Sequence, residues 1–374
     1  MPPPNATLEQ RRDAFGSIVQ WVQQNAEMLF PDNATSWCYA HGQECPAHPL
    51  CRPRQTPFYQ RPLMICCAGV SCLPWTSEGS QDADASECEV PHGIWMAERK
   101  LTGSKLQEDI AFVECTPRYP IEKVFQQSLE DTHFCVWVRV GPELMGWPHK
   151  RLRTTVWHGP DHPKAIAADF AARFHRATIL SGHAFALATE EDRTEEYCML
   201  ARKQKNHLKP LDVYTTPKSD LLRLILPPGG VQRFTEWMEE ASLASSLGGD
   251  FLFDIDHHPN TKGNSGGSDW PVNLRHGTVV AVNTQRPDSW EIMTALEHFA
   301  AMGFLLFPEM QEDFGKSPMS EALEGLSSFQ LKKFVGNGMH LVTQCAWMMY
   351  VLGNTSRVDP RQSQSESPAQ FEGH

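Results

Sequence analysis

The stretch ICCAGVSCLPWTSEGSQ, Ile65 to Gln81, joins an apolar run to a polar turn. The run PLMICCAGV, residues 62–70, has the length and composition of a buried strand, and Cys72 follows it. A thiol just beyond a buried strand lies at the carboxyl edge of a sheet, where open α/β folds place their active sites. An inert, buried thiol is the alternative for any isolated cysteine, so the segments that accompany Cys72 decide between the two interpretations.

Two more apolar runs have the length of strands, DIAFVEC at 109–115 and FCVWVRV at 134–140, and Glu114 lies at the end of the first. The segment GWPHKRLRTTV that follows places Arg151 and Arg153 two residues apart, so an extended strand would point both the same way. Because polar or helix-forming segments separate these runs, the sequence predicts the sheet of an α/β fold.

Length and composition favour a globular chain inside the cell. The 374 residues, 41% of them hydrophobic, suffice for two domains with a sizeable core. The polar opening and the lack of an eighteen-residue apolar run predict no secretory signal and no membrane partner. Eleven scattered cysteines, an odd number, favour reduced thiols. The expected location is intracellular, and nuclear in a eukaryote.

The formal net charge of -12 argues against a phosphate backbone as the partner of the whole chain. The stretch 145–235 nevertheless carries more Lys and Arg than Asp and Glu. This asymmetry leaves room for a local nucleic-acid surface, and the basic run ARKQKNHLK at 201–209 is a candidate. A solvated helix face explains the same run equally well.

A cysteine, a glutamate and paired arginines in this order resemble the cytosine-C5 DNA methyltransferase family. AGVSCLPWTSEGSQ is similar to its nucleophile loop, FVECTP to its Glu-Asn-Val segment, and GWPHKRLRTTV to its Gly-x-Pro-Gln-x-Arg-x-Arg segment. MTALEHFAAMGF resembles a Thr-x-x-Glu segment with Thr294 and Glu297, and FQLKKFVGNGMHL resembles the closing Gly-Asn segment with Gly336 and Asn337. The five motifs follow the family order.

The resemblance implies a partial Rossmann-like methyltransferase sheet with a smaller target-recognition domain. The implied activity is methyl transfer from S-adenosylmethionine to cytosine C5 of a flipped base in DNA, with RNA as an alternative substrate. The implied catalytic residues are Cys72, Glu114, Arg151 and Arg153, and the implied cofactor contacts are Pro74, Gly336 and Asn337. The implied regions are the first part of the catalytic domain at 1–157, target recognition at 158–277, closing helices at 278–353 and a disordered tail at 354–374.

The chain also departs from the family pattern. Ser71 replaces the proline before the nucleophile, Cys115 the asparagine after the glutamate, and His149 a glutamine. The glycine-rich Asp-x-Phe-x-Gly-x-Gly cofactor turn has no counterpart, so the sequence predicts a chain truncated at this motif. The alternative function is therefore a catalytically inactive or truncated homologue that binds DNA or a protein partner.

Five other segments have specific expectations. Residues 8–30, 165–180 and 289–304 are expected to be helical from their apolar periodicity. CYAHGQECPAHPLC at 38–51 holds enough cysteine and histidine for zinc, but its spacing matches no zinc module, so we expect no metal. DIDHHPNTKGN at 254–264 is expected to be a polar loop, because adjacent ligands rarely share one ion.

Overall fold

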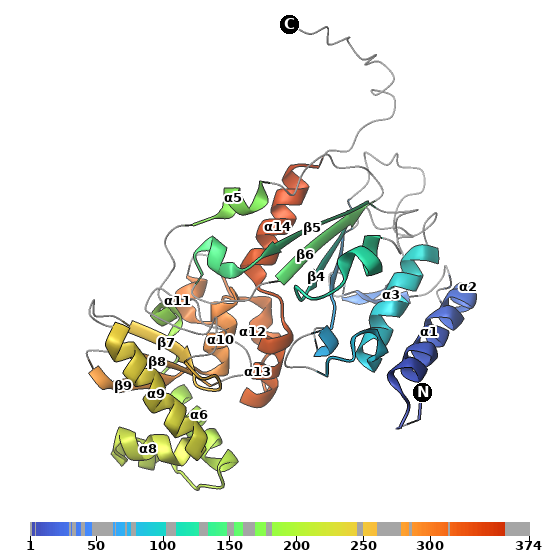
Figure 1. The fold of residues 1–374 in the computed structure, drawn as a ribbon. Coiled ribbons are helices and arrows are strands. Elements are labelled where there is room, and N and C mark those ends of the chain that lie inside the picture. Colours follow the sequence, from blue (N-terminus) through green and yellow to red (C-terminus); the bar gives the residue numbers. More distant parts are fainter. Residues whose placement is uncertain are drawn as a thin grey trace, which may run out of the picture. The chain divides into compact units, whose positions relative to one another are not determined.

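The computed structural model describes residues 2–3, 5–29, 31, 35–38, 42–46, 63, 65–71, 73–75, 80–101, 110–126, 134–147, 153–159, 169–176, 182–244, 250–259, 278–283, 286–312 and 315–355 (Figure 1). The chain divides into two compact units. Unit 1 contains Met1–Arg139, Thr154–Phe170 and Trp347–His374, and unit 2 contains Val140–Arg153 and Ala171–Ala346. These limits are not those of the predicted regions at 1–157, 158–277 and 278–353, whose roles stay predictions.

Unit 1 contains a four-stranded sheet with the order β3 (Ile65–Gly69), β4 (Ile110–Cys115), β6 (Arg153–Gly159), β5 (Phe134–Val140). β3 and β4 are parallel, and helix α3 (Val90–Leu101) lies between them in the chain, as a parallel connection requires. β6 is antiparallel to β4. All six residues of β4 are buried, which explains its continuous apolar run. The predicted strands and the α/β class are confirmed.

Helix α1 (Leu8–Gln24) packs against α3 (Figure 1). It begins at a capping box, in which Thr7 and Gln10 bond each other's backbone N–H, and ends before Asn25. The predicted helix 8–30 is thus confirmed as α1 followed by a short α2 (Ala26–Leu29). The two helices approach closely because position 93 is glycine: a Cβ there would lie 2.6 Å from Cγ2 of Val19.

Short elements complete unit 1. β1 (Thr35–Cys38) and β2 (Gln43–Pro46) form an antiparallel pair. The 3-10 helices η3 (Leu73–Trp75), η4 (Ala83–Ala85) and η5 (Glu87–Glu89) connect β3 to α3, and η6 (Glu122–Gln126) follows β4. Within the predicted helix 165–180, the described residues form only α5 (Phe170–Phe174), which belongs to unit 2 from Ala171 onward.

Unit 2 is built on an antiparallel sheet, β7 (Asp250–Asp254), β8 (Val279–Asn283) and β9 (Arg286–Ile292). One face packs against α6 (Glu190–Lys203), α8 (Lys218–Ile225) and α9 (Pro228–Ala244) around Trp237 and Phe253, whose rings stack at 5.5 Å. The other face packs against η8 (Gly182–Phe185) and α10 (Ala295–Ala301).

The predicted helix at 289–304 was wrong in its first turn. Residues 289–292 belong to β9, because buried Trp290 and Ile292 alternate with the more exposed Ser289 and Glu291. α10 begins only after Thr294, whose side chain caps it.

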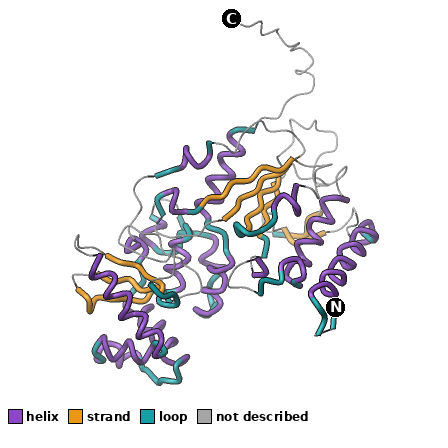
Figure 2. Tube along the Cα trace, viewed as in Figure 1, coloured by secondary structure: helices purple, strands orange, loops and turns teal. Residues whose placement is uncertain are grey.

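The remaining elements of unit 2 are η7 (Pro142–Met145), α7 (Pro210–Thr215), α11 (Pro308–Gln311), α12 (Pro318–Ala322) and α13 (Ser328–Asn337). The last helix, α14 (Leu341–Gly353), buries Trp347 and Val351 completely, as a core helix face should. Figure 2 shows helices and strands in both units. Among the described helices, none has the length and apolarity needed to cross a membrane.

Candidate functional site

Two of the predicted catalytic segments end at the same edge of the unit 1 sheet. Parallel pairing sets Gly69, the last residue of β3, opposite Glu114, and the Val70 N–H donates to the Glu114 carbonyl oxygen at 3.0 Å. Ser71 is the next described residue, and Cys72 lies outside the described residues. The strand that precedes Cys72 in the chain, β3, therefore lies beside the strand that carries Glu114, β4. The role of Cys72 stays a prediction.

Glu114 occupies an unusual position for a carboxylate. It is the penultimate residue of a strand whose residues are all buried, and its own exposed fraction is 8%. Its other strand partner is Thr155 of β6, and Thr116, which is also buried, follows at the strand end. A carboxylate so removed from water interacts strongly with any proton donor or charge nearby. This suits a general acid, although its role is still a prediction.

The arginine pair is only partly described. Arg151 lies outside the described residues, and so does the side chain of Arg153. The backbone of Arg153 begins β6, directly before Thr154, which pairs with Cys115. Because β6 runs antiparallel to β4, its first residues lie at the carboxyl end of β4.

The predicted cofactor contacts fall in both units. Pro74 is buried in η3, at the carboxyl end of β3. Gly336 is buried near the end of α13, and Asn337 is the last residue of that helix, with its side chain outside the described residues. Their cofactor role stays a prediction.

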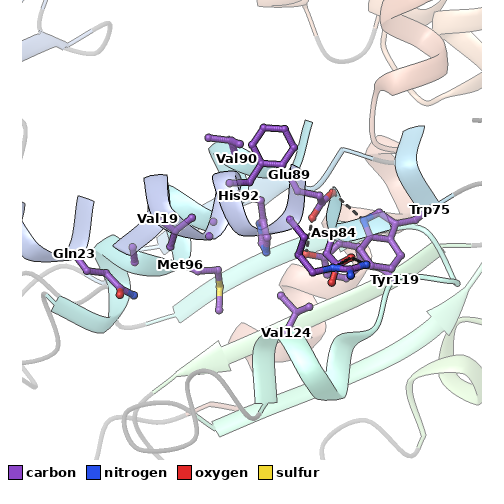
Figure 3. Close-up of a pocket in the computed structure, with 15 residues that line it drawn as sticks. Val19, Gln23, Trp75, Asp84, Glu89, Val90, His92, Met96, Tyr119 and Val124 are labelled. Atoms are coloured by element: carbon purple, nitrogen blue, oxygen red, sulfur yellow. Dashed lines mark hydrogen bonds and ion pairs between the residues drawn. The ribbon is translucent and has the colours of Figure 1, made fainter. Parts of the chain in front are cut away.

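A cavity of about 310 Å³, lined in part by Trp75, opens in unit 1 (Figure 3). Its walls come from α1, the 3-10 helices after β3, α3 and the segment after β4. Most of the lining is apolar, including Phe15, Val19 and Met96, and Trp75, His92 and Tyr119 contribute rings. The sequence pointed to Trp75 as part of the nucleophile loop but not to the cavity.

Glu89 is one of two carboxylates that line this cavity, and it accepts hydrogen bonds from two neutral donors. Trp75 Nε1–H donates to Oε1 at 2.8 Å and the Tyr119 hydroxyl donates to Oε2 at 3.3 Å (Figure 3). Burial raises the pKa of Glu89, while these two hydrogen bonds oppose the rise and nearby Asp84 adds to it. Burial also raises the pKa of Tyr119, so its hydroxyl remains a donor.

At the rim of the cavity, Asp84 forms ion pairs with Arg12 and Lys123. Arg12 Nε donates to Asp84 Oδ1 at 2.8 Å, and Lys123 Nζ lies 3.9 Å from Oδ2. The bond to Asp84 also raises the pKa of Arg12. The charge of Arg12 is thus engaged at the rim rather than at Glu89.

In unit 2, the Thr-x-x-Glu segment forms a capping box joined to an ion pair. The Thr294 hydroxyl accepts from the Glu297 N–H, and Glu297 Oε2 accepts from the Thr294 N–H at 2.7 Å. Arg193 NH2 lies 2.7 Å from Glu297 Oε1, and the exposed fraction of Glu297 is 0%. Gly303 ends this segment with φ +92, and a Cβ there would lie 2.6 Å from Val342 Cγ2. The motif therefore has a structural explanation here.

The described parts of the two candidate metal segments form no metal cluster. Of the cysteines and histidines at 38–51, only Cys38 and Cys45 lie in described residues, and the described part of the chain contains no group of three or more His, Cys, Asp or Glu suited to a metal. In the 254–264 segment, buried Asp254 bonds His257 Nδ1 at 2.9 Å and accepts from the Asp256 N–H. The bond to Asp254 raises the pKa of His257.

Comparison with known proteins gives a distant likeness. No family model matches the chain, and no curated protein matches it. Among solved structures, it is similar to an Entamoeba histolytica methyltransferase (TM-score 0.43, 12% identity, covering 78% of each chain) and to the S. pombe Dnmt2 methyltransferase (TM-score 0.41, 11% identity, 77% of each chain). A Spodoptera frugiperda DNMT2 variant has a TM-score of 0.36 at 12% identity, covering 77% of this chain and 79% of that one. Because these TM-scores are below 0.5, no site or activity of this chain follows from them.

Proposed function

We propose that this chain is a cytosine-C5 methyltransferase-like enzyme that acts on a flipped cytosine of DNA through a covalent bond to Cys72. The observation that supports it most directly is the pairing of Gly69 with Glu114, which ends the two predicted catalytic segments at one sheet edge. The order of the motifs in the sequence supports it as well.

The proposed chemistry follows from the needs of cytosine. C5 is too weak a nucleophile for direct methylation. The Cys72 thiolate therefore adds to C6, and the π electron pair of the C5–C6 bond moves onto C5. A proton or hydrogen bond from Glu114 at N3 stabilises the adduct, and Glu114 lies buried near the end of β4. Arg151 and Arg153 hold the base or a neighbouring phosphate. Loss of the C5 proton after methylation then expels the thiolate.

S-Adenosylmethionine would supply the methyl group. Pro74, Gly336 and Asn337 remain the proposed contacts.

Covalent trapping on DNA that contains 5-fluorocytosine tests this function, because fluorine at C5 blocks the final elimination. We expect an adduct that survives a denaturing gel, requires the cofactor and is lost in Cys72→Ala. Cys67→Ala is the matched control, since Cys67 is an exposed cysteine of β3, the strand that precedes Cys72 in the chain. Glu114→Gln should slow the adduct about 10²- to 10⁴-fold.

Absence of any adduct from folded protein would contradict the enzymatic proposal. DNA or partner binding without chemistry would then be the function to pursue. Trapping on 5-fluorocytosine RNA but not on DNA would reassign the substrate.

A further inference from the structure

The cavity in unit 1 contains none of the residues to which the catalytic proposal gives a role. Its rings form a corner: those of Trp75 and Tyr119 have centroids 5.2 Å apart and planes at 64°, and those of His92 and Tyr119 lie 5.6 Å apart at 87°. All three residues line the cavity (Figure 3). Aromatic faces set at such angles can surround one small group from several sides.

Glu89 supplies a negative charge to this aromatic corner. Its described hydrogen-bond donors, Trp75 and Tyr119, are both neutral, and no Lys, Arg or His of the described residues forms an ion pair with it. Glu89 also directly precedes the twelve-residue helix α3, whose N-terminus favours an anion. The nearest cation of the cavity wall, Arg12, is bonded to Asp84.

We propose that this cavity binds a small organic cation that carries its charge on an alkylated nitrogen or sulfur. Such an ion needs a counter-charge, ring faces and an apolar surface for its alkyl groups, and Glu89, the ring corner and residues such as Val19 and Met96 provide these. The volume of about 310 Å³ is at the small end of ligand pockets. A metal ion is not the ligand that we propose, because the described residues contain no group of three or more His, Cys, Asp or Glu that could hold one.

Calorimetric titration with choline and with its neutral carbon analogue, 3,3-dimethylbutan-1-ol, tests the charge preference. The two probes have nearly the same shape, so we expect choline to bind about tenfold more tightly because only it gains cation–π and ion-pair attraction. Glu89→Gln should remove this preference. Glu87→Gln is the matched control, because Glu87 is an exposed residue of the same 3-10 helix and does not line the cavity. Equal binding of the two probes, or binding of neither, would overturn the proposal.

Trp75→Leu provides a second variant. It removes one ring and the hydrogen bond that this ring donates to Glu89, but it leaves the carboxylate itself in place. It should weaken choline more than the neutral analogue, and equal loss for both would contradict a role for the ring. S-Adenosylmethionine, added as a competitor, distinguishes two sources of the cation. Displacement of choline indicates the sulfonium of the cofactor, and its absence indicates a separate ammonium ligand. These titrations need no methyl transfer, so their failure is distinct from failure of the trapping experiment.

Discussion

Glu297 in unit 2 and Glu89 in unit 1 show two ways to remove a carboxylate from water. Glu297 accepts three hydrogen bonds: from Arg193 Nη2 at 2.7 Å, from the Ala188 N–H at 2.8 Å and from the Thr294 N–H at 2.7 Å. Within the described part of the chain, Glu89 accepts hydrogen bonds from two neutral donors, Trp75 and Tyr119. A buried charge without an opposite charge is costly, so proteins normally pair it as Glu297 is paired.

The difference teaches how a structural carboxylate is distinguished from a candidate binding group. Glu297 joins α6, α10 and the segment before α6, and its charge is neutralised within the fold. Glu89 lines a cavity and keeps a charge that its described neighbours do not neutralise. The first should matter for stability and the second for binding.

The largest effect should come from Arg193→Met, which leaves Glu297 buried without its cation. We expect a loss of about 3 to 5 kcal/mol in the free energy of unfolding of unit 2. Urea denaturation with hydrogen exchange of the α10 amides measures it. Arg202→Met, an exposed position on the same helix, is the control and should cost little. A loss below about 1 kcal/mol would show that Glu297 does not depend on Arg193.

The next largest effect on stability is expected where α1 packs against α3, the two helices that line the Glu89 cavity. Gly93→Ala would place a Cβ 2.6 Å from Val19 Cγ2 and should cost about 1 to 3 kcal/mol. Gly16→Ala is its counterpart on α1, where a Cβ meets no atom within 4 Å, and it should stabilise by about 0.5 to 1 kcal/mol. Thermal unfolding of both variants measures the opposite signs. The same sign for both would contradict close packing of α1 on α3.

Thr294→Val should have a smaller effect, because it removes the hydroxyl that caps α10 and keeps the side-chain shape. We expect a loss of about 1 kcal/mol, measured by urea denaturation. Thr7→Val, in the exposed capping box of α1, is the counterpart in unit 1. An equal cost at both sites would mean that burial beside Glu297 adds nothing to the cap.

The smallest effect is the pH dependence that Glu89 contributes. Burial raises its pKa in the folded state above the ordinary 4.5, so folding favours its protonated form. The stability from this group is fully present below about pH 4.5 and is lost as the pH rises through the raised pKa. Glu89→Gln should therefore gain stability relative to the wild type between pH 4 and pH 7. A parallel pH profile for the two proteins would show that Glu89 titrates normally.

The strands of unit 1 could be predicted because β3, β4 and β5 are short apolar runs bounded by polar segments. The helix predicted at 289–304 was wrong in its first turn because β9, which ends with SWEI, and α10 follow each other closely in the sequence. Only the alternating burial of Ser289 to Ile292 distinguishes the strand from the helix. The Glu89 cavity could not be predicted, because its walls come from segments that meet only when α1 packs on α3.

The sequence alone determined the α/β class and the ends of the buried strands, because both depend on a local pattern of apolar and polar residues. Tertiary structure decided that Gly69 lies beside Glu114, that Arg193 neutralises Glu297 and that Trp75 and Tyr119 meet at Glu89. Those relations join residues far apart in the chain, and their free energies depend on burial and distance, which no local pattern specifies.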